Sequence, residues 1–258
     1  MNRQWTAVEA ISRAAREDEA VRAVFLKGSL ALGLDDEHAD VDIYCLVEQG
    51  ELASFLERRL DILQSYADIL YHSESNFVGP QVVAVFTDGL HVDLYAVTPD
   101  NFPPVGAIRS LWDPDSRLSA LAAGMKDHSL NWQAIHGHFS EFSFTLLEFG
   151  AAWRRNDVLW SARLASHLAG DLGVVLRSLY DPANGQLGTK RLEGRLPPQV
   201  REQMQLAVSS IGGSETLAAV LSLCRIMRSA LATLEEKWQE QADWSLFDYM
   251  EKELMRAL

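Results

Sequence analysis

The stretch from Lys27 to Val47 reads KGSLALGLDDEHADVDIYCLV and joins an acidic segment to an apolar one. Five carboxylates fall within the eight residues from Asp35 to Asp42, and a β-branched and aromatic run follows at once. Asp40 and Asp42 alternate with hydrophobic residues, and successive side chains of a β-strand point to opposite faces of the sheet. The alternation therefore predicts a strand that carries both carboxylates on one face.

The rest of the first half mixes helical and strand-like segments. Glu51–Gln64 has the apolar spacing of a helix. Asp88-Gly89 is a favoured two-residue hairpin turn, since both residues tolerate positive φ. This succession is not an uninterrupted βαβ series, so it predicts a mixed sheet. Its strands are expected at Val21–Lys27, Val41–Val47, Tyr66–Tyr71, Gln81–Thr87 and Leu90–Thr98.

From about residue 124 the pattern becomes helical. Apolar residues then recur at steps of three and four along one face: Trp132, Ile135, Phe139, Phe142, Leu146, Phe149 and Trp153. Asn156 is a candidate cap for a second helix that runs to about Tyr180. The sequence therefore predicts an α+β protein with two domains. Residues 1–123 form an N-terminal domain with a mixed β-sheet, and residues 124–258 form a C-terminal all-helical bundle domain.

The charge of the chain is unevenly distributed. The net charge is −13, and residues 1–128 hold 21 acidic and 10 basic residues. Such a surface disfavours nucleic acid, which needs basic residues for its phosphates. It suits metal ions or a cationic small molecule.

Composition and the N-terminal segment also bear on the compartment. The N-terminal segment has no apolar signal core and no run approaches the length of a membrane span, so we expect a cytoplasmic protein without a membrane partner. Cys45 and Cys224 lie in apolar stretches and are expected to be buried, reduced thiols.

A third acid, Asp93, lies in the run HVDLY at residues 91–95, on the second strand of the predicted hairpin. Asp40, Asp42 and Asp93 would repel one another if neighbouring strands brought them into a partly desolvated cleft. A divalent cation removes that cost, and Mg²⁺ is usually shared between a few carboxylates and substrate phosphates. The three acids therefore predict a magnesium site.

Gly28 and Ser29 follow a strand and precede a predicted helical turn. Backbone N–H groups and a hydroxyl at such a point can hold an anion, and glycine permits its close approach to the backbone. An anion cradle ten residues before an acidic metal platform suits a nucleoside triphosphate with Mg²⁺. Lys27 is placed to reach a phosphate, or equally to extend its charge to solvent from the strand end.

Gly28-Ser29, ten residues, Asp40-Val41-Asp42-Ile43 and then Val92-Asp93-Leu94 together resemble the signature of the DNA polymerase β-type nucleotidyltransferase superfamily. The two-domain layout is similar to that of antibiotic nucleotidyltransferases, which implies a catalytic domain at residues 1–123 and a substrate-binding helical bundle at residues 124–258. The lincosamide nucleotidyltransferases resemble most of the chain, including AVFLKGSLALG and HFSEFSF…RRNDVLWSARLASHL. The aminoglycoside adenylyltransferases resemble it more loosely.

This resemblance implies a nucleotidyltransferase that moves a nucleoside monophosphate from a triphosphate, with ATP expected, to a hydroxyl of an antibiotic. Asp40 and Asp42 would hold Mg²⁺, while Gly28 and Ser29 would position the β- and γ-phosphates. Asp93 would be a third metal ligand or the acceptor of the hydroxyl proton, since family members use that position in both ways. The family analogy also suggests a homodimer.

The resemblance implies a further nucleotide contact from the helical domain. Lys190 and Arg191 form a basic pair in the loop GTKRLEGRLPP and would contact the triphosphate, or equally belong to an ordinary surface loop. Other polar residues of this domain have ordinary interpretations. Glu141 and Glu148 are expected on a solvated helix face, and His136 and His138 lack the spacing of a zinc site.

The acceptor stays open at this stage. The acidic first half favours the polycationic aminoglycosides, whereas the sequence pattern favours lincosamides. A second hypothesis keeps the chemistry but makes a protein side chain the acceptor. A third is a catalytically silent, antitoxin-like module, although all three acids are present.

Overall fold

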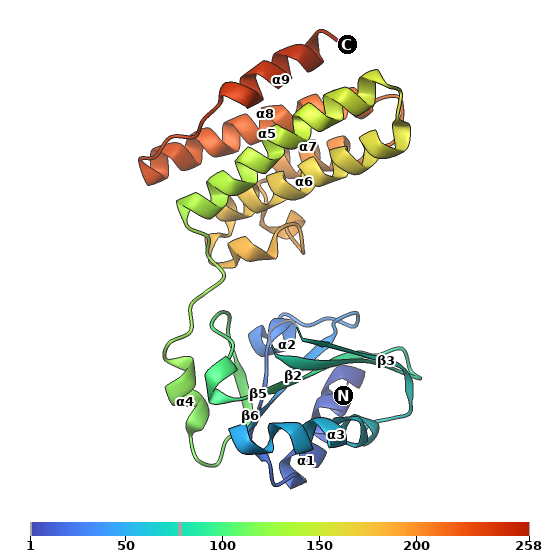
Figure 1. Cartoon of the computed structure of the whole chain (residues 1–258), viewed down its shortest axis with the longest axis vertical. Coiled ribbons are helices and arrows are strands. Elements are labelled where there is room, and N and C mark those ends of the chain that lie inside the picture. Colours follow the sequence, from blue (N-terminus) through green and yellow to red (C-terminus); the bar gives the residue numbers. More distant parts are fainter. Residues whose placement is uncertain (1, 77–78, 258) are drawn as a thin grey trace. The chain divides into compact units, whose positions relative to one another are not determined.

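The computed structural model describes residues 2–76 and 79–257, and it divides the chain into two compact units. The division falls between Asp127 and His128, four residues after the predicted boundary at 123. The first unit contains the sheet and the second is helical (Figure 1). The predicted fold class, a mixed-sheet domain followed by an all-helical domain, is confirmed, while the functional roles of the two domains stay predictions.

Within the described residues, six strands form one mixed sheet in the order β3-β4-β5-β2-β1-β6. The pair β2–β5 is parallel, and the other neighbouring strands are antiparallel. The parallel pair lies in the middle of the sheet, where both of its strands are buried. The strands are β1 (Val21–Leu26), β2 (Val41–Val47), β3 (Ile69–Asn76), β4 (Pro80–Phe86), β5 (His91–Val97) and β6 (Arg109–Trp112).

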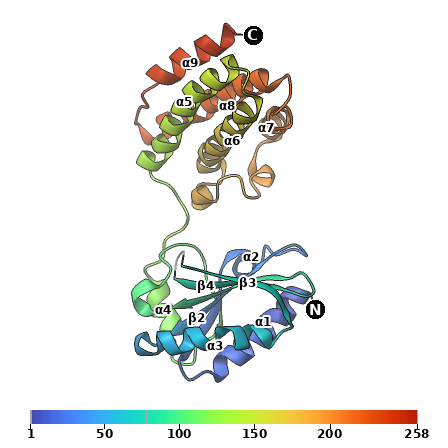
Figure 2. The ribbon, with the colours of Figure 1, turned by 45° about the vertical axis from the view of Figure 1, so that its right-hand side comes forward.

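Helices α1 (Arg3–Glu17) and α3 (Leu52–Gln64) cover one face of this sheet (Figures 1 and 2). Their apolar sides bury every second residue of the central strands, including Val41 and Ile43 of β2. The other face carries a smaller cluster around Phe25, Tyr44 and Tyr95, to which α4 (Arg117–Ala122) adds Leu118. The alternation of the strands thus separates a fully buried face from a partly open one.

Several predicted elements differ from the structure in their boundaries. The strand expected at Tyr66–Tyr71 runs instead from Ile69 to Asn76 as an exposed edge strand, and β6 was not predicted. The predicted hairpin forms, but its loop has three residues: the Phe86 N–H donates to the Leu90 carbonyl oxygen at 2.9 Å. Gly89 alone takes a positive φ there, 78°, as is usual for a type I turn followed by a left-handed residue.

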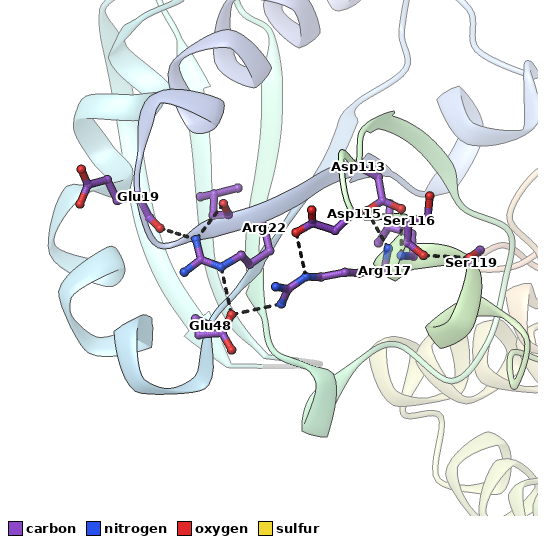
Figure 3. A network of polar contacts seen from close by, with 10 residues as sticks. Glu19, Arg22, Glu48, Asp113, Asp115, Ser116, Arg117 and Ser119 are labelled. Carbon is purple, nitrogen blue, oxygen red and sulfur yellow. Dashed lines mark hydrogen bonds and ion pairs between the residues drawn. The ribbon is translucent and has the colours of Figure 1, made fainter.

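Short polar networks fasten α4 to the sheet (Figure 3). The Glu48 carboxylate, at the end of β2, accepts from Arg22 Nε at 3.0 Å and from Arg117 Nη1 at 3.2 Å. Both oxygens of Asp113 accept backbone N–H groups at the start of α4. The Glu48 carboxylate, at the end of β2, therefore links this strand to β1 through Arg22 and to α4 through Arg117.

The second unit is built on long helices around one apolar core. Helices α5 and α6 pack along each other and contribute Phe139, Phe142 and Leu168 to it. Asp157, rather than the predicted Asn156, caps α6 by accepting the Trp160 N–H at 3.2 Å, because Asn156 takes a left-handed φ of 54°. The helices are α5 (Trp132–Arg154), α6 (Val158–Tyr180), α7 (Pro198–Ser209), α8 (Thr216–Trp238) and α9 (Ser245–Met255).

Helix α8 corrects the expectation that no segment approaches a membrane span. By length and composition it is apolar enough to cross a bilayer. Most of the apolar window is nevertheless buried in the helical unit, as is usual for the core helix of a bundle.

Both cysteines are free and buried, as predicted. Burial raises the pKa of Cys45 to about 12 and also raises that of Cys224. Both therefore stay thiols at neutral pH.

Asp18 joins α1 to α3 through Arg58. Arg58 Nε donates to Asp18 Oδ2 at 2.7 Å and Arg58 Nη2 to Oδ1 at 2.8 Å. The Arg58 hydrogen bonds lower the pKa of Asp18 below its ordinary value, and burial opposes that shift. Because the pKa is lowered by folding, the pair stabilises the protein at neutral pH and loses that effect as pH falls through the folded-state pKa.

We expect Asp18→Asn to lower the free energy of unfolding by about 1 kcal/mol at pH 7, given that Arg58 is partly exposed. The difference from the wild type should shrink as the pH falls below 4. Urea unfolding across this pH range measures it, with Asp61→Asn on the exposed side of α3 as the control for lost charge. A difference that stayed constant down to pH 2 would contradict the assignment.

Candidate active site

The candidate site lies on the partly open face of the sheet, where β2 and β5 begin. These strands are parallel and in register, so Asp42 is directly paired with Asp93. Their neighbours in sequence pack into the core under α1 and α3, which turns both carboxylates to the opposite face. Adjacent strands are about 4.8 Å apart, so two acids face the same small volume.

Asp40 lies just before this pair. The strand β2 begins at Val41, so Asp40 belongs to the preceding loop and not to the strand that the alternation predicts. It is half-buried, as is Asp42, whereas Asp93 is buried. The hydrogen bond to Asp93 raises the pKa of His91, burial opposes that shift, and the charges of Asp93, Asp40 and Asp42 add to the rise.

Gly28 closes the site from the end of β1. Its φ is +63°, and a Cβ atom built on it would lie 2.1 Å from Asp42 Oδ2. A side chain at this position is thus excluded both by the backbone and by the carboxylate. Ser29 follows in α2 (Gly28–Leu32), one short turn of helix.

Lys27 precedes this glycine and turns toward the same face. Its Nζ donates to the Val105 carbonyl oxygen at 2.6 Å and lies 5.8 Å from the centre of the Tyr44 ring. Burial lowers the pKa of Lys27, and the charge of Asp42 opposes that shift. In this arrangement the ammonium group binds a backbone carbonyl oxygen, and its contact with a phosphate stays a prediction.

Two stacked tyrosines form the floor beside the acids. The rings of Tyr44 and Tyr95 are 4.2 Å apart and nearly parallel, at 7°. Burial, and then the charges of Asp93 and Asp42, raise the pKa of Tyr95 to about 12, while burial also raises the pKa of Tyr44. Both phenols therefore stay protonated at neutral pH and are unsuited to the role of a base.

His91 is a site residue to which sequence reasoning gave no role. Its Nε2 lies 3.0 Å from Asp93 Oδ1, and this hydrogen bond is the largest cause that raises the His91 pKa. The signal was present in the run HVDLY, since residues two apart on a strand share a face. The spacing alone does not show that the imidazole bonds to the carboxylate, which depends on the rotamers of both side chains.

A site for Mg²⁺ needs several oxygen donors close together. Among the described residues, no three His, Cys, Asp or Glu side chains are grouped closely enough to make a metal site by themselves. Asp42 and Asp93 nevertheless form an in-register pair of oxygen donors with Asp40 nearby. Mg²⁺ commonly binds one or two carboxylates together with substrate phosphates, and Asp42 with one neighbouring carboxylate, Asp40 or Asp93, fits that need. The ligand roles of the three acids stay predictions.

Lys190 belongs to the second unit, where hydrogen bonds from α6 hold the loop that carries it. The buried Arg177 of α6 donates from Nε to the Gly188 carbonyl oxygen at 2.7 Å and also donates to the Lys190 carbonyl oxygen. Gly173 of the same helix lies against Thr189, whose Cγ2 would be 2.3 Å from an added Cβ. The Lys190 side chain is exposed. Its contact with a nucleotide stays a prediction.

The remaining polar candidates of the helical unit have local roles. Glu141 and Glu148 are exposed on α5. His138 Nδ1 lies 2.9 Å from Asp171 Oδ1, which joins α5 to α6, and His136 Nδ1 lies 3.4 Å from the Ser140 hydroxyl.

Comparison with known proteins identifies the class of this chain. Residues 1–253 match the family model of streptomycin adenylyltransferases, so nearly the whole chain is covered. The protein is a nucleotidyltransferase. It belongs to the streptomycin adenylyltransferase family.

An adenyltransferase and a CD-NTase are among the solved structures to which the chain is similar. An aminoglycoside 6-adenyltransferase from Bacillus subtilis is 13% identical over 100% of this chain and 97% of its own, with a TM-score of 0.40. The CD-NTase CdnG of Bradyrhizobium diazoefficiens, solved in complex with GTP, is 13% identical over 92% of this chain and 75% of its own, with a TM-score of 0.31. A search of curated proteins found no match. The family assignment therefore rests on the family model.

The contact between Gly28 and Asp42 can be tested against a matched glycine. Gly33 has nearly the same φ, +66°, but within the described chain nothing lies within 4 Å of its added Cβ. Both Gly28→Ala and Gly33→Ala should lose roughly 1–2 kcal/mol of stability from the left-handed backbone. Gly28→Ala should in addition lower nucleotidyl transfer by about 100-fold, since it displaces the Asp42 carboxylate. Equal activity of the two variants would show that the contact has no part in the reaction.

Proposed function

We propose that the protein transfers AMP from ATP, with Mg²⁺, to a hydroxyl group of an aminoglycoside of the streptomycin type, and releases pyrophosphate. The observation that carries this proposal is the in-register pair Asp42 and Asp93, with Gly28 packed against Asp42. The family model supports an aminoglycoside acceptor rather than a lincosamide. The net charge of −13 favours a polycationic acceptor in the same way.

In this proposal Asp40 and Asp42 hold Mg²⁺. When bound, the ion would neutralise charge on the triphosphate and stabilise the departing pyrophosphate. Gly28 and Ser29 position the β- and γ-phosphates through the backbone at the start of α2. Gly28 thus serves twice, because the missing side chain makes room both for the phosphates and for the Asp42 carboxylate.

Asp93 is assigned as the acceptor of the hydroxyl proton. One of its oxygens, Oδ1, is already held by His91, which supports a role separate from the metal pair. The acceptor oxygen forms a bond to the α-phosphorus, and the bond from that phosphorus to the oxygen bridging to the β-phosphate breaks. The proton of the hydroxyl moves to Asp93, and pyrophosphate leaves with the electron pair of the broken bond.

The first experiment measures pyrophosphate release with Mg²⁺ and ATP in the presence of streptomycin, other aminoglycosides and a lincosamide. We expect release only with an aminoglycoside. Asp42→Asn should abolish it without lowering the melting temperature of the metal-free protein, because the change relieves carboxylate repulsion. Glu37→Gln removes the same charge from the exposed loop and should keep full activity.

Other outcomes would redirect the proposal. Release with the lincosamide alone would replace the acceptor class. No release with any of these compounds, despite binding of ATP and Mg²⁺, would contradict the antibiotic acceptor and favour a protein. Asp93→Asn separates the two roles of that residue: loss of transfer with unchanged Mg²⁺ dependence of ATP binding supports the proton acceptor, and a weakened Mg²⁺ dependence supports the ligand.

A separate test concerns Lys190, which we propose to contact the triphosphate. Gly173→Ala should displace Thr189 and the loop beside it, and so raise the KM for ATP roughly tenfold, equivalent to about 1.4 kcal/mol. The KM for the acceptor should not change. The double variant Gly173→Ala/Thr189→Ala removes the Cγ2 atom and should restore the KM for ATP.

Gly170→Ala is the matched control for this series. It lies in the same helix, and among the described residues nothing lies within 4 Å of its added Cβ. Normal kinetics in Gly173→Ala, or an equal defect in Gly170→Ala, would remove the support for a nucleotide contact from this loop.

A further inference from the structure

His91 is the hydrogen-bond partner that the structure gives to the Asp93 carboxylate. It is the first residue of β5, two positions before Asp93 and on the same face. The distance from Nε2 to Asp93 Oδ1 is 3.0 Å, and the side chains are 41% and 12% exposed. The imidazole is therefore more exposed to solvent than the carboxylate that it contacts.

The backbone around this pair is held on both sides. His91 pairs with Val85 and Asp93 with Val83 on β4, while Asp93 also pairs with Asp42 on β2. The main chain of β5 therefore cannot turn, and the remaining freedom of Asp93 is rotation of its own side chain. The bond from His91 restricts that rotation.

The direction of the bond follows from the chemistry of the two groups. An ionised carboxylate only accepts hydrogen bonds, so the imidazole must carry its proton on Nε2. Donation to Oδ1 fixes the orientation of the carboxylate and leaves its second oxygen, Oδ2, as the acceptor for another hydrogen bond. A donor on Asp93 Oδ1 also lowers the repulsion between this carboxylate and Asp42, which is paired with it.

We propose that His91 is a positioning residue that fixes the Asp93 carboxylate so that Oδ2 meets the hydroxyl of the acceptor. This inference rests on the proposed role of Asp93 as proton acceptor. His91 need not touch either substrate in this role. Its loss should therefore lower kcat and leave the KM values for ATP and acceptor unchanged.

The side chains of glutamine and asparagine separate the hydrogen bond from other effects of substitution. The amide nitrogen of glutamine is as far from the backbone as Nε2 of histidine, whereas that of asparagine reaches only the position of Nδ1. His91→Gln can therefore keep the bond to Asp93. His91→Asn and His91→Ala cannot.

The experiment measures kcat and both KM values in the full-length protein with Mg²⁺, ATP and streptomycin, or whichever acceptor supports release. His91→Ala and His91→Asn should lower kcat by roughly 100-fold, because the base is misplaced. His91→Gln should recover most of that loss. His72→Ala, an exposed histidine of β3, should match the wild type.

The double variant His91→Ala/Asp93→Asn tests whether His91 acts through Asp93. If it does, adding His91→Ala to Asp93→Asn lowers kcat no further. Two losses that multiply would overturn the inference. So would wild-type kcat in His91→Ala, or a defect in His91→Gln as large as that in His91→Ala with a lowered melting temperature.

Failure of the proposed function gives a different result. If Asp93→Asn itself keeps wild-type activity, Asp93 is not the proton acceptor and both statements fall. If Asp93→Asn is inactive while His91→Ala is normal, only the positioning role of His91 is lost.

Discussion

The site depends on one strand pairing, the parallel and in-register contact between β2 and β5. Helix α3 and strands β3 and β4 separate these two strands along the chain, yet the pairing places Asp42 beside Asp93. A slip of one residue would turn one of the two carboxylates into the core under α1 and α3. The apolar residues on either side of each acid in the sequence are buried in the core. Their burial opposes any such slip and so maintains the pairing of Asp42 with Asp93.

The parts of this structure that the sequence predicts are those with local signals. The alternation of β2, the turn residues at the end of β4 and the long apolar face of α5 each indicate their element directly. Strand β6 has four residues and, among the described strands, pairs with β1 alone, so its formation depends on a partner that is distant in sequence. Strand β2 has the predicted bounds, Val41–Val47, although the alternation of the sequence extends to Asp40 in the preceding loop.

The candidate site divides in the same way. Its acids could be named from spacing and neighbours, whereas the bond from His91 and the contact of Gly28 with Asp42 could not. The sequence suggests that Gly28 is small so that a phosphate can approach. The structure adds a second cause within the protein, which is the space taken by Asp42 Oδ2. A glycine in a motif can thus be required by a neighbouring side chain as well as by a ligand.

The two units bury separate hydrophobic cores, and this has a consequence for synthesis. Every described strand of the sheet ends by Trp112, so the first unit has its complete sheet before α5 has left the ribosome. Domains generally fold in this order as the chain emerges. The long-range pairing of β2 with β5 is the slow kind of contact, whereas adjacent helices such as α5 and α6 form local ones. The chain therefore presents its slowest folding step first, while the apolar helices that could interfere with it are still being made.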